Sequence, residues 1–381
     1  WVNKLFADTV ADIIADEPED RPVIVMPQDY HLYLMPAFLR ERIGARFQIQ
    51  PFIHIPWPGP ERWHILPKTI REHIFVSLLQ SDRIGFQTER DAFNFVQTCR
   101  VLVDGAHSHG RRDAIEYAGR TVNAIGYPIS IDADKVEKIA GESTTTLQKN
   151  QLLSVVGDTK VILRTDRVEP SKNILRGLEA YRDLLTRYPE HRGNVQFVQL
   201  LVPSRMGVEE YSTYLKDIMA AAGMINADFS EELWEPVRTI VGDNYARALA
   251  AMQIYDVLLV NPIKDGMNLV AKEGVLVNNR DGVLVLSESA GAFFELGEDA
   301  LVVSPFDTYS TANAIHEALT MPSDEKQRRA DNMRQHVREH DVRRWFATQM
   351  EDALKAFDSH SKKAVTSSTP SASTSDASST S

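Results

Sequence analysis

The stretch "VLLVNPIKDGMNLVAKEGV", residues Val257–Val275, joins a short apolar run to a polar segment and then to a helix-forming run. Its first four residues fit a buried strand, because strands covered on both faces read as continuous apolar runs. The Asp265-Gly266 pair predicts a tight turn, and we expect a helix to start near Met267. A buried strand, a turn and a helix form the repeating unit of an α/β fold with parallel sheets.

This connection carries more polar side chains than a plain turn requires, namely Lys264, Asp265, Asn268 and Glu273. A helix that starts near Met267 presents free backbone N–H groups, which suit sugar hydroxyls or a phosphate. Glu273, roughly two turns into that helix, is placed to accept hydrogen bonds from a ribose. The alternative is a capped helix with Asp265 near its N-terminus, a placement worth about 0.3–1 kcal/mol. Capping accounts for one of the four residues only.

The same unit recurs along the chain, with strand-like runs at residues 161–163, 197–201, 257–260 and 283–286. In a doubly wound sheet the loops after these strands share one edge, where ligands bind. Arg167 and Lys172 follow the first strand in "DRVEPSKN", and Arg205 follows the second in "VPSR". Three cations at one edge suit a phosphate or diphosphate. The alternative is that each cation pairs with a nearby acid, such as Asp166 or Glu169.

The preceding part of the chain shows a similar alternation, and two polar residues follow its apolar runs. Asp29 comes after "PVIVMP", and His54 lies within "FIHIPWP". Strand ends in α/β folds often carry functional side chains, so both residues are site candidates. The alternative is a loop carboxylate and a hydrogen-bonded core histidine.

The chain of 381 residues predicts about two domains. We expect one domain over residues 1–148 and a second over 149–335, with the boundary near Lys149. A helix over 336–357 follows. Residues 358–381 are rich in Ser and Thr and carry too little apolar surface to offset the entropy of ordering, so we expect a disordered tail.

The net charge of -11 argues against general nucleic-acid binding but leaves room for a local basic pocket that binds a small anion. The single cysteine, Cys99, allows neither an intrachain disulfide nor a thiolate metal cluster, which fits a reducing, cytoplasmic compartment. No apolar run approaches the roughly 20 residues of a membrane span. The chain starts at Trp1 inside an amphipathic pattern, so we expect a fragment whose N-terminal part is missing.

Seven motifs then occur in order: "DYHL", "HIPWP", "RIGFQTERDAFNF", "DR…SKN", "VPSR", "DGMNLVAKE" and "SESAGA". Together they resemble the trehalose-6-phosphate synthase family, glycosyltransferase family 20, from Trp1 to about Phe357. The resemblance implies a GT-B fold, in which two facing Rossmann-like domains hold the active site in the cleft between them. It also implies that the helix around Trp345 crosses back to the first domain.

The resemblance implies a role for each candidate residue. Arg167 and Lys172 are expected to bind the donor diphosphate, and Glu273 the ribose. His54 is expected to contact the donor sugar, Asp29 to lie by the acceptor, and Arg205 to hold the acceptor phosphate; the catalytic set is thus Asp29, His54, Arg167 and Lys172. The donor sugar and phosphate are assigned to Asp265, Gly266, Met267, Asn268, Leu269 and Val270.

The implied reaction transfers glucose from a UDP- or GDP-linked donor to glucose 6-phosphate with retention, giving trehalose 6-phosphate, without a cofactor or a metal. Rivals are another acceptor, as in glucosylglycerol-phosphate synthases or a pseudo-glycosyltransferase, and a non-catalytic sugar-phosphate-binding regulator. The partners expected are small molecules, with a homo-oligomer left open. Gly274 departs from the family pattern, which usually has an aromatic residue there. Without its upstream part, the isolated chain is expected to be inactive.

Overall fold

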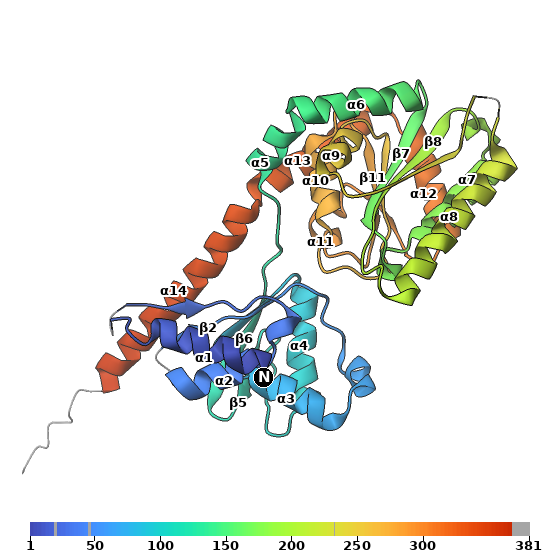
Figure 1. The fold of residues 1–381 in the computed structure, drawn as a ribbon. Coiled ribbons are helices and arrows are strands. Elements are labelled where there is room, and N and C mark those ends of the chain that lie inside the picture. Colours follow the sequence, from blue (N-terminus) through green and yellow to red (C-terminus); the bar gives the residue numbers. More distant parts are fainter. Residues whose placement is uncertain (19–20, 45–46, 232, 368–381) are drawn as a thin grey trace, which may run out of the picture.

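The computed structural model describes residues 1–18, 21–44, 47–231 and 233–367. Two α/β halves, built on separate sheets, are visible in Figure 1. This confirms the predicted α/β fold with parallel sheets. Of the segment predicted as a disordered tail, residues 368–381 lie outside the described residues.

The first half holds a four-stranded sheet in the order β3-β4-β6-β5 and a two-stranded parallel sheet, β1-β2. Its strands are β1 (Ile24–Val25), β2 (Gln48–Ile49), β3 (Phe52–Ile53), β4 (Arg83–Phe86), β5 (Ala114–Tyr117) and β6 (Arg120–Gly126). Its helices are α1 (Val2–Ile14), α2 (Met35–Ile43), α3 (Lys68–Leu78) and α4 (Glu89–Leu102), with 3-10 turns at η1 (Tyr30–Leu32) and η2 (Pro60–Ile65). β5 is antiparallel to β6, an arrangement that the sequence analysis does not predict. The hairpin turns at Ala118 and Gly119, both with positive φ, as a two-residue turn requires.

The second half holds a six-stranded parallel sheet in the order β12-β11-β10-β7-β8-β9. Its strands are β7 (Lys160–Arg167), β8 (Val195–Val202), β9 (Val237–Val241), β10 (Val257–Val260), β11 (Val283–Ser287) and β12 (Leu301–Val303). The chain winds outward from β7 in one direction and then from β10 in the other. The crevice between β7 and β10 is therefore the switch point, where doubly wound sheets bind ligands.

Helices cover both faces of this sheet. Successive residues of a strand point to opposite faces and therefore pack into two different hydrophobic cores. Leu258 and Val260 pack with α5 (Ala133–Ala140), α6 (Ser143–Val156), α9 (Tyr245–Met252), α10 (Leu269–Val277) and α13 (Ser323–Glu339). Val257 and Leu259 pack with α7 (Ile174–Arg187), α8 (Glu209–Phe229) and α12 (Thr308–Thr320). The short elements η3 (Pro170–Lys172), η4 (Pro189–His191) and α11 (Phe293–Leu296) lie in the connections.

The packing corrects the predicted boundary at Lys149. That residue lies inside α6, and the buried residues of α5 and α6 belong to the core of the six-stranded sheet. The chain changes sheet at residues 127–132, before α5. An amphipathic pattern predicts which face of a helix is buried, but not which of two sheets it covers.

The last helix, α14 (Val342–Ser367), returns along the first half, as Figure 1 shows. Trp345 donates from Nε1 to the carbonyl oxygen of Tyr127 at 3.1 Å, and its ring packs edge-on against Phe52. Gln48 donates to the carbonyl oxygen of Ala353 at 3.1 Å. The helix extends beyond Phe357, where the sequence predicts disorder; residues 358–367 contain no proline or glycine that would end it.

Candidate active site

The loops after β7 and β10 meet at the switch point through one ion pair. Lys172 Nζ lies 2.5 Å from Asp265 Oδ2, and Asn268 donates from Nδ2 to the same oxygen at 3.0 Å. Burial lowers the pKa of Lys172, but Asp265 and Asp166 outweigh it and hold the pKa above its ordinary value. The crevice therefore contains an ammonium group that keeps its charge at neutral pH on a nearly buried side chain.

The N-terminus of α10 opens into this crevice. The helix starts at Leu269, and Asn268 caps it by accepting from the N–H of Ala271 at 3.3 Å. This corrects both the expected start near Met267 and the alternative in which Asp265 is the cap. Asn268 has a φ of 76°, in the left-handed region that Asn tolerates better than most residues. Asp265 is thereby released from capping and pairs with Lys172.

A buried polar layer lies beneath the ion pair, and the sequence interpretation did not assign it. Arg164 is fully buried; its Nη1 donates to Asp166 Oδ2 at 2.9 Å and to the carbonyl oxygen of Lys172 at 3.0 Å, and its Nη2 donates to Asn261. Burial raises the pKa of Asp166 to about 6, although Arg164 and Lys172 act against it. The layer fixes the main chain that carries Lys172. The sequence signal that could have revealed this layer is the position of Arg164, which interrupts the apolar run of a strand.

The other two predicted cations are exposed and occupy separate positions. Arg167 pairs with Glu169 at 3.0 Å, which realises the alternative in which a cation binds a neighbouring acid. Arg205 donates to the hydroxyl of Tyr211 at 2.9 Å, and this bond raises the pKa of Arg205, with Glu169 and Tyr30 contributing. Lys172 is thus the one member of this predicted trio that lies deep in the crevice.

The first half brings His54 and Asp29 to the same region. A Cβ atom built on Gly266 would lie 2.0 Å from the carbonyl oxygen of His54, so the loop before α10 touches the end of β3 directly. Burial lowers the pKa of His54, while the charge of Asp29 acts in the opposite direction. Asp29 has a φ of 66° and a shielded Oδ1 without a hydrogen-bond partner. His54 and Asp265 therefore lie on two facing loops.

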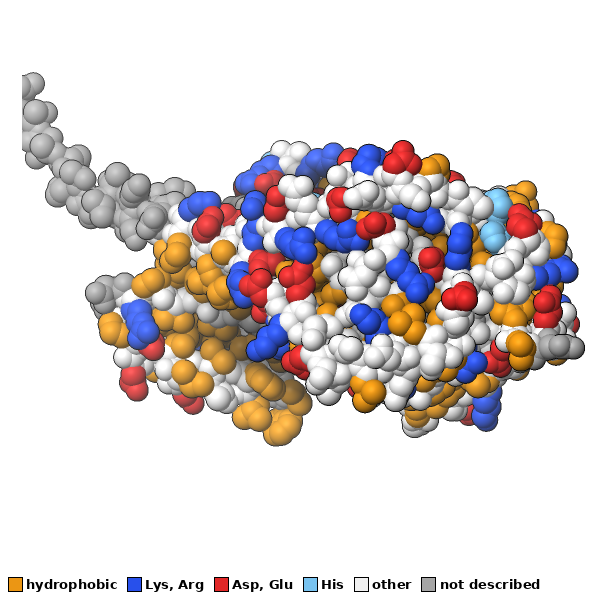
Figure 2. Space-filling view, turned by 90° about the horizontal axis from the view of Figure 1, so that it is seen from above, with side chains coloured by type: hydrophobic (Ala, Val, Ile, Leu, Met, Phe, Trp, Pro, Cys, Tyr) orange, Lys and Arg blue, Asp and Glu red, His pale blue; other side chains and the backbone are white. Residues whose placement is uncertain are grey.

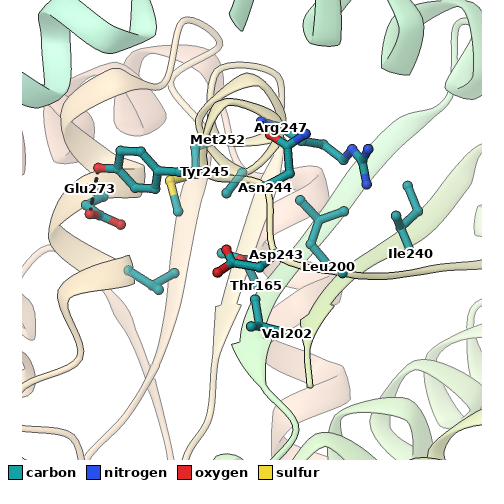
Figure 3. A pocket seen from close by; sticks show the side chains of 13 residues that line it. Thr165, Leu200, Val202, Ile240, Asp243, Asn244, Tyr245, Arg247, Met252 and Glu273 are labelled. Carbon is teal, nitrogen blue, oxygen red and sulfur yellow. Dashed lines mark hydrogen bonds between the residues drawn. The ribbon is translucent and has the colours of Figure 1, made fainter. Parts of the chain in front are cut away.

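Glu273 lines a separate pocket of about 150 Å³ at the carboxyl ends of β7, β8 and β9. Figure 3 shows Glu273 and Tyr245 at one side, joined by a hydrogen bond of 2.9 Å from the Tyr245 hydroxyl to Oε1. Burial raises the pKa of Glu273, and the bond from Tyr245 acts against it. Thr165 and Asn244 also line the pocket. The sequence interpretation missed these residues because it did not assign β9, whose burial is only partial.

One group of metal-type ligands lies outside the crevice. Within the described residues, Glu190, His191 and His316 bring one ligand atom each within 4.8 Å of the others. His191 and His316 are already hydrogen-bonded to each other at 2.9 Å, and the positive charge of Lys160 acts on His191. The positive charge of Lys160 disfavours a metal cation in this group. The group also lies at the amino end of β8, whereas the switch point lies at the carboxyl ends of the strands.

The family model of glycosyltransferase family 20 matches residues 1–355. The chain belongs to glycosyltransferase family 20. Curated relatives in the family include a bifunctional trehalose-6-phosphate synthase/phosphatase of Thermoproteus tenax, 38% identical over 90% of this chain and 46% of the relative. A trehalose-6-phosphate synthase of Klebsiella pneumoniae is 35% identical over 92% of this chain and 72% of the relative.

Solved structures of the family match both halves over 92–93% of this chain and show its GT-B fold. An Escherichia coli family member bound to UDP-2-fluoro glucose matches with a TM-score of 0.84, at 31% identity over 92% of this chain and 76% of the other. A trehalose-phosphate synthase of Burkholderia xenovorans with glucose-6-phosphate gives 0.83 at 30%, over 93% and 77%. The N-terminal domain of a Candida albicans trehalose-6-phosphate phosphatase gives 0.84 at 26%, over 93% and 74%.

This family 20 chain spans about half the length of the Thermoproteus relative. Among its described residues, no helix is both long enough and apolar enough to cross a membrane. Charged side chains of both signs are mixed over the face of the six-stranded half that Figure 2 shows.

Proposed function

We propose that this chain forms the donor side and much of the acceptor side of a retaining glucosyltransferase. In this proposal it moves glucose from a nucleoside-diphosphate-glucose to glucose 6-phosphate and yields trehalose 6-phosphate. The observation that carries the proposal is the Lys172–Asp265 pair at the switch point, beside the open N-terminus of α10. A deep cation and free backbone N–H groups together suit a diphosphate whose leaving oxygen gains charge.

The donor is assigned to the six-stranded half. Lys172 binds the diphosphate from inside the crevice, and Arg167 reaches it from the exposed edge after release from Glu169. Asp265 presents its second carboxylate oxygen to the sugar, with the backbone of residues 266–270 beside it. The pocket with Glu273 and Tyr245 takes the nucleoside, with Glu273 accepting from the ribose. The relative bound to UDP-2-fluoro glucose favours uridine as the base.

The acceptor is assigned to the facing loops of the first half. Asp29 has one shielded carboxylate oxygen without a protein partner, and we assign its carboxylate to a sugar hydroxyl of the acceptor. Arg205 is exposed and supplies a phosphate contact. His54 contacts the donor sugar from the opposite side. The relative that holds glucose-6-phosphate supports the choice of acceptor.

The chemistry requires charge stabilisation rather than a protein nucleophile. As the glycosidic oxygen of the diphosphate leaves, Lys172 and the N–H groups of α10 stabilise its charge more than they stabilise the bound donor. The departing phosphate oxygen accepts the proton of the acceptor hydroxyl on the same face of the sugar. No described side chain is then required to form a covalent intermediate, and no metal step enters the scheme.

A second function is favoured by one comparison. The same fold with a TM-score of 0.84 occurs in the N-terminal domain of a protein named for phosphatase activity. A sugar-phosphate-binding regulator would keep the pockets but not the turnover. Acceptors such as glycerol 3-phosphate or an amino-cyclitol phosphate are the alternatives within the transferase class.

A cytoplasmic location is also proposed, because the single cysteine is buried and unpaired.

The test separates binding from transfer. Calorimetry with UDP-glucose and GDP-glucose measures donor binding, and nucleoside-diphosphate release is then followed with each acceptor, with the product identified by mass. Transfer to glucose 6-phosphate supports the synthase. Donor or sugar-phosphate binding without release, repeated with the longer parent protein, supports the regulator. Absence of binding by any nucleotide sugar overturns both.

A further inference from the structure

The segment that joins the two halves, residues 127–132, is held by its alternate carbonyl groups. The carbonyl oxygen of Tyr127 accepts from Trp345, that of Ile129 from Lys272 Nζ at 2.9 Å, and that of Ile131 from the N–H of Val342 at 3.0 Å. Two of these donors belong to α14. The third, Lys272, belongs to α10 in the six-stranded half.

Ile129 differs from its neighbours because both its N–H group and its carbonyl oxygen are bound by buried side chains. These two side chains come from opposite halves. Its N–H donates to Gln87 Oε1 at 3.0 Å, and Gln87 follows β4 of the first half. Gln87 is 2% exposed and Lys272 is 0% exposed. A buried ammonium group is costly unless it is paired. Lys272 meets this cost through Glu295 at 2.6 Å, with Ile129 as its further acceptor.

Gln87 also determines the protonation of His54. A backbone N–H can only donate, so the side-chain oxygen of Gln87 must face Ile129 and its amide nitrogen must face His54. Gln87 Nε2 lies 3.2 Å from His54 Nδ1, which is therefore the unprotonated acceptor. The proton then sits on Nε2, where it is donated to Gln28 Oε1 at 3.0 Å. The polar chain runs from α10 through the connecting segment to the histidine of the facing loop.

We propose that Gln87 and Lys272, which bind the two sides of Ile129, are positioning residues: Gln87 fixes the tautomer of His54 directly, and Lys272 acts through Ile129 to hold His54 in register with α10. The inference rests on the proposed function for its catalytic meaning, because His54 and the N-terminus of α10 contact the same donor sugar in that proposal. The hydrogen-bond chain itself is independent of which sugar is transferred. The rival is a structural ion pair between Lys272 and Glu295 that has no influence on His54.

The tautomer is tested by nitrogen NMR on chain labelled at histidine, with the His54 signals assigned through His54→Asn. The unmodified chain should show a protonated Nε2 and an unprotonated Nδ1. Gln87→Glu keeps an acceptor for Ile129 but offers His54 an acceptor instead of a donor, so Nδ1 should become protonated, either by a change of tautomer or by formation of the imidazolium. Gln87→Leu should give a mixture. An unchanged His54 spectrum in Gln87→Glu overturns the proposal.

The mechanical half is tested by hydrogen exchange at the Ile129 amide in Lys272→Met. Loss of the bond on the carbonyl side should speed exchange about tenfold, which corresponds to about 1.4 kcal/mol of local opening. Lys160→Met is the matched control, because Lys160 also donates to a carbonyl oxygen, that of Leu319, far from the segment. Lys272→Met/Glu295→Gln removes both buried charges and serves if the single variant folds poorly. Exchange that stays at the control value in both variants contradicts the role of Lys272.

The rate of glucose transfer shows whether the two structural effects matter for catalysis. In Lys272→Met, donor affinity should stay within about twofold, since the proposed contacts to the diphosphate and the nucleoside lie in the six-stranded half, while the transfer rate falls about tenfold. If neither the chain nor the longer parent protein transfers glucose, the proposed function fails, yet the tautomer and exchange measurements still decide this inference. A transfer rate equal to that of Lys160→Met, in a chain that does transfer glucose, overturns the catalytic meaning.

Discussion

At the residue scale, Lys172 and Arg205 are both cations, but replacing each of them should impair the binding of a different substrate. Lys172→Ala removes the deep charge of the crevice and should weaken binding of a nucleoside-diphosphate-glucose about 10²-fold, if it supplies roughly 3 kcal/mol. Arg205→Ala should leave donor affinity unchanged and raise the KM for the sugar phosphate. Calorimetry and acceptor titrations measure the two effects. Lys216→Ala, an exposed cation on α8, is the control, and equal losses in all three variants would refute the assignments.

Asp166 makes stability depend on pH in an identifiable window. Its pKa is about 6 in the folded chain and 3.8 ordinarily, so the folded state keeps a proton that the unfolded state has lost. The stabilising contribution of protonated Asp166 to the free energy of unfolding is therefore complete below about pH 4. It disappears as the pH rises through about 6. The stability difference between the unmodified chain and Asp166→Asn should fall across this window by on the order of 2 kcal/mol. Urea unfolding at several pH values measures it; a constant difference contradicts it.

Gly274 stands where the family pattern has an aromatic residue, and the core around it explains the change. A Cβ atom at this position would lie 2.4 Å from Leu258 Cδ2 and 3.5 Å from the ring of the buried Tyr255. These two side chains occupy the space instead. Gly274→Ala should lower the free energy of unfolding by about 1–3 kcal/mol through overpacking. Adding Leu258→Ala should recover part of the loss, since it vacates the contact; additive losses in urea unfolding would argue against this packing.

At the element scale, the sequence was informative wherever apolar runs were unbroken. The runs at 161–163 and 257–260 predicted β7 and β10, and strand order then brought Lys172 and Asp265 to one edge. It was less informative where a choice depended on tertiary contacts. Asp265 and Asn268 are both good cap residues, and only the position of Lys172 decides between them. β9 is short and partly exposed, so its loop and the pocket beside Tyr245 were not predicted.

The loop before α10 requires a glycine because it touches the other half. Gly266→Ala places a methyl group against the His54 carbonyl oxygen and should displace the two facing loops. Backbone atoms cannot move aside as a flexible side chain does, so we expect transfer to fall at least tenfold, with donor binding less affected. Gly207→Ala is the control, since nothing lies within 4 Å of its Cβ position. Full transfer activity in Gly266→Ala would show that the loops do not need this contact.

At the scale of the whole molecule, α14 ties the halves together. Trp345→Ala removes a hydrogen bond to Tyr127 and the ring contact with Phe52, at a cost of about 3 kcal/mol. The halves should then unfold in two separate thermal transitions rather than one. Calorimetry resolves the transitions, and Phe346→Ala is the matched control because the neighbouring ring is half exposed. A single unshifted transition in Trp345→Ala would show that the halves are coupled elsewhere.

The two crossings between the halves, at residues 127–132 and at the start of α14, lie side by side, joined by the bond from Val342 to Ile131. In sequence, the six-stranded half is therefore an insertion within the first half, and its own ends are adjacent. Such a segment is suited to expression by itself or to circular permutation. During synthesis, the ribosome releases the whole insertion before α14 emerges, so the contacts of the first half with α14, such as the bond from Gln48 to Ala353, form last.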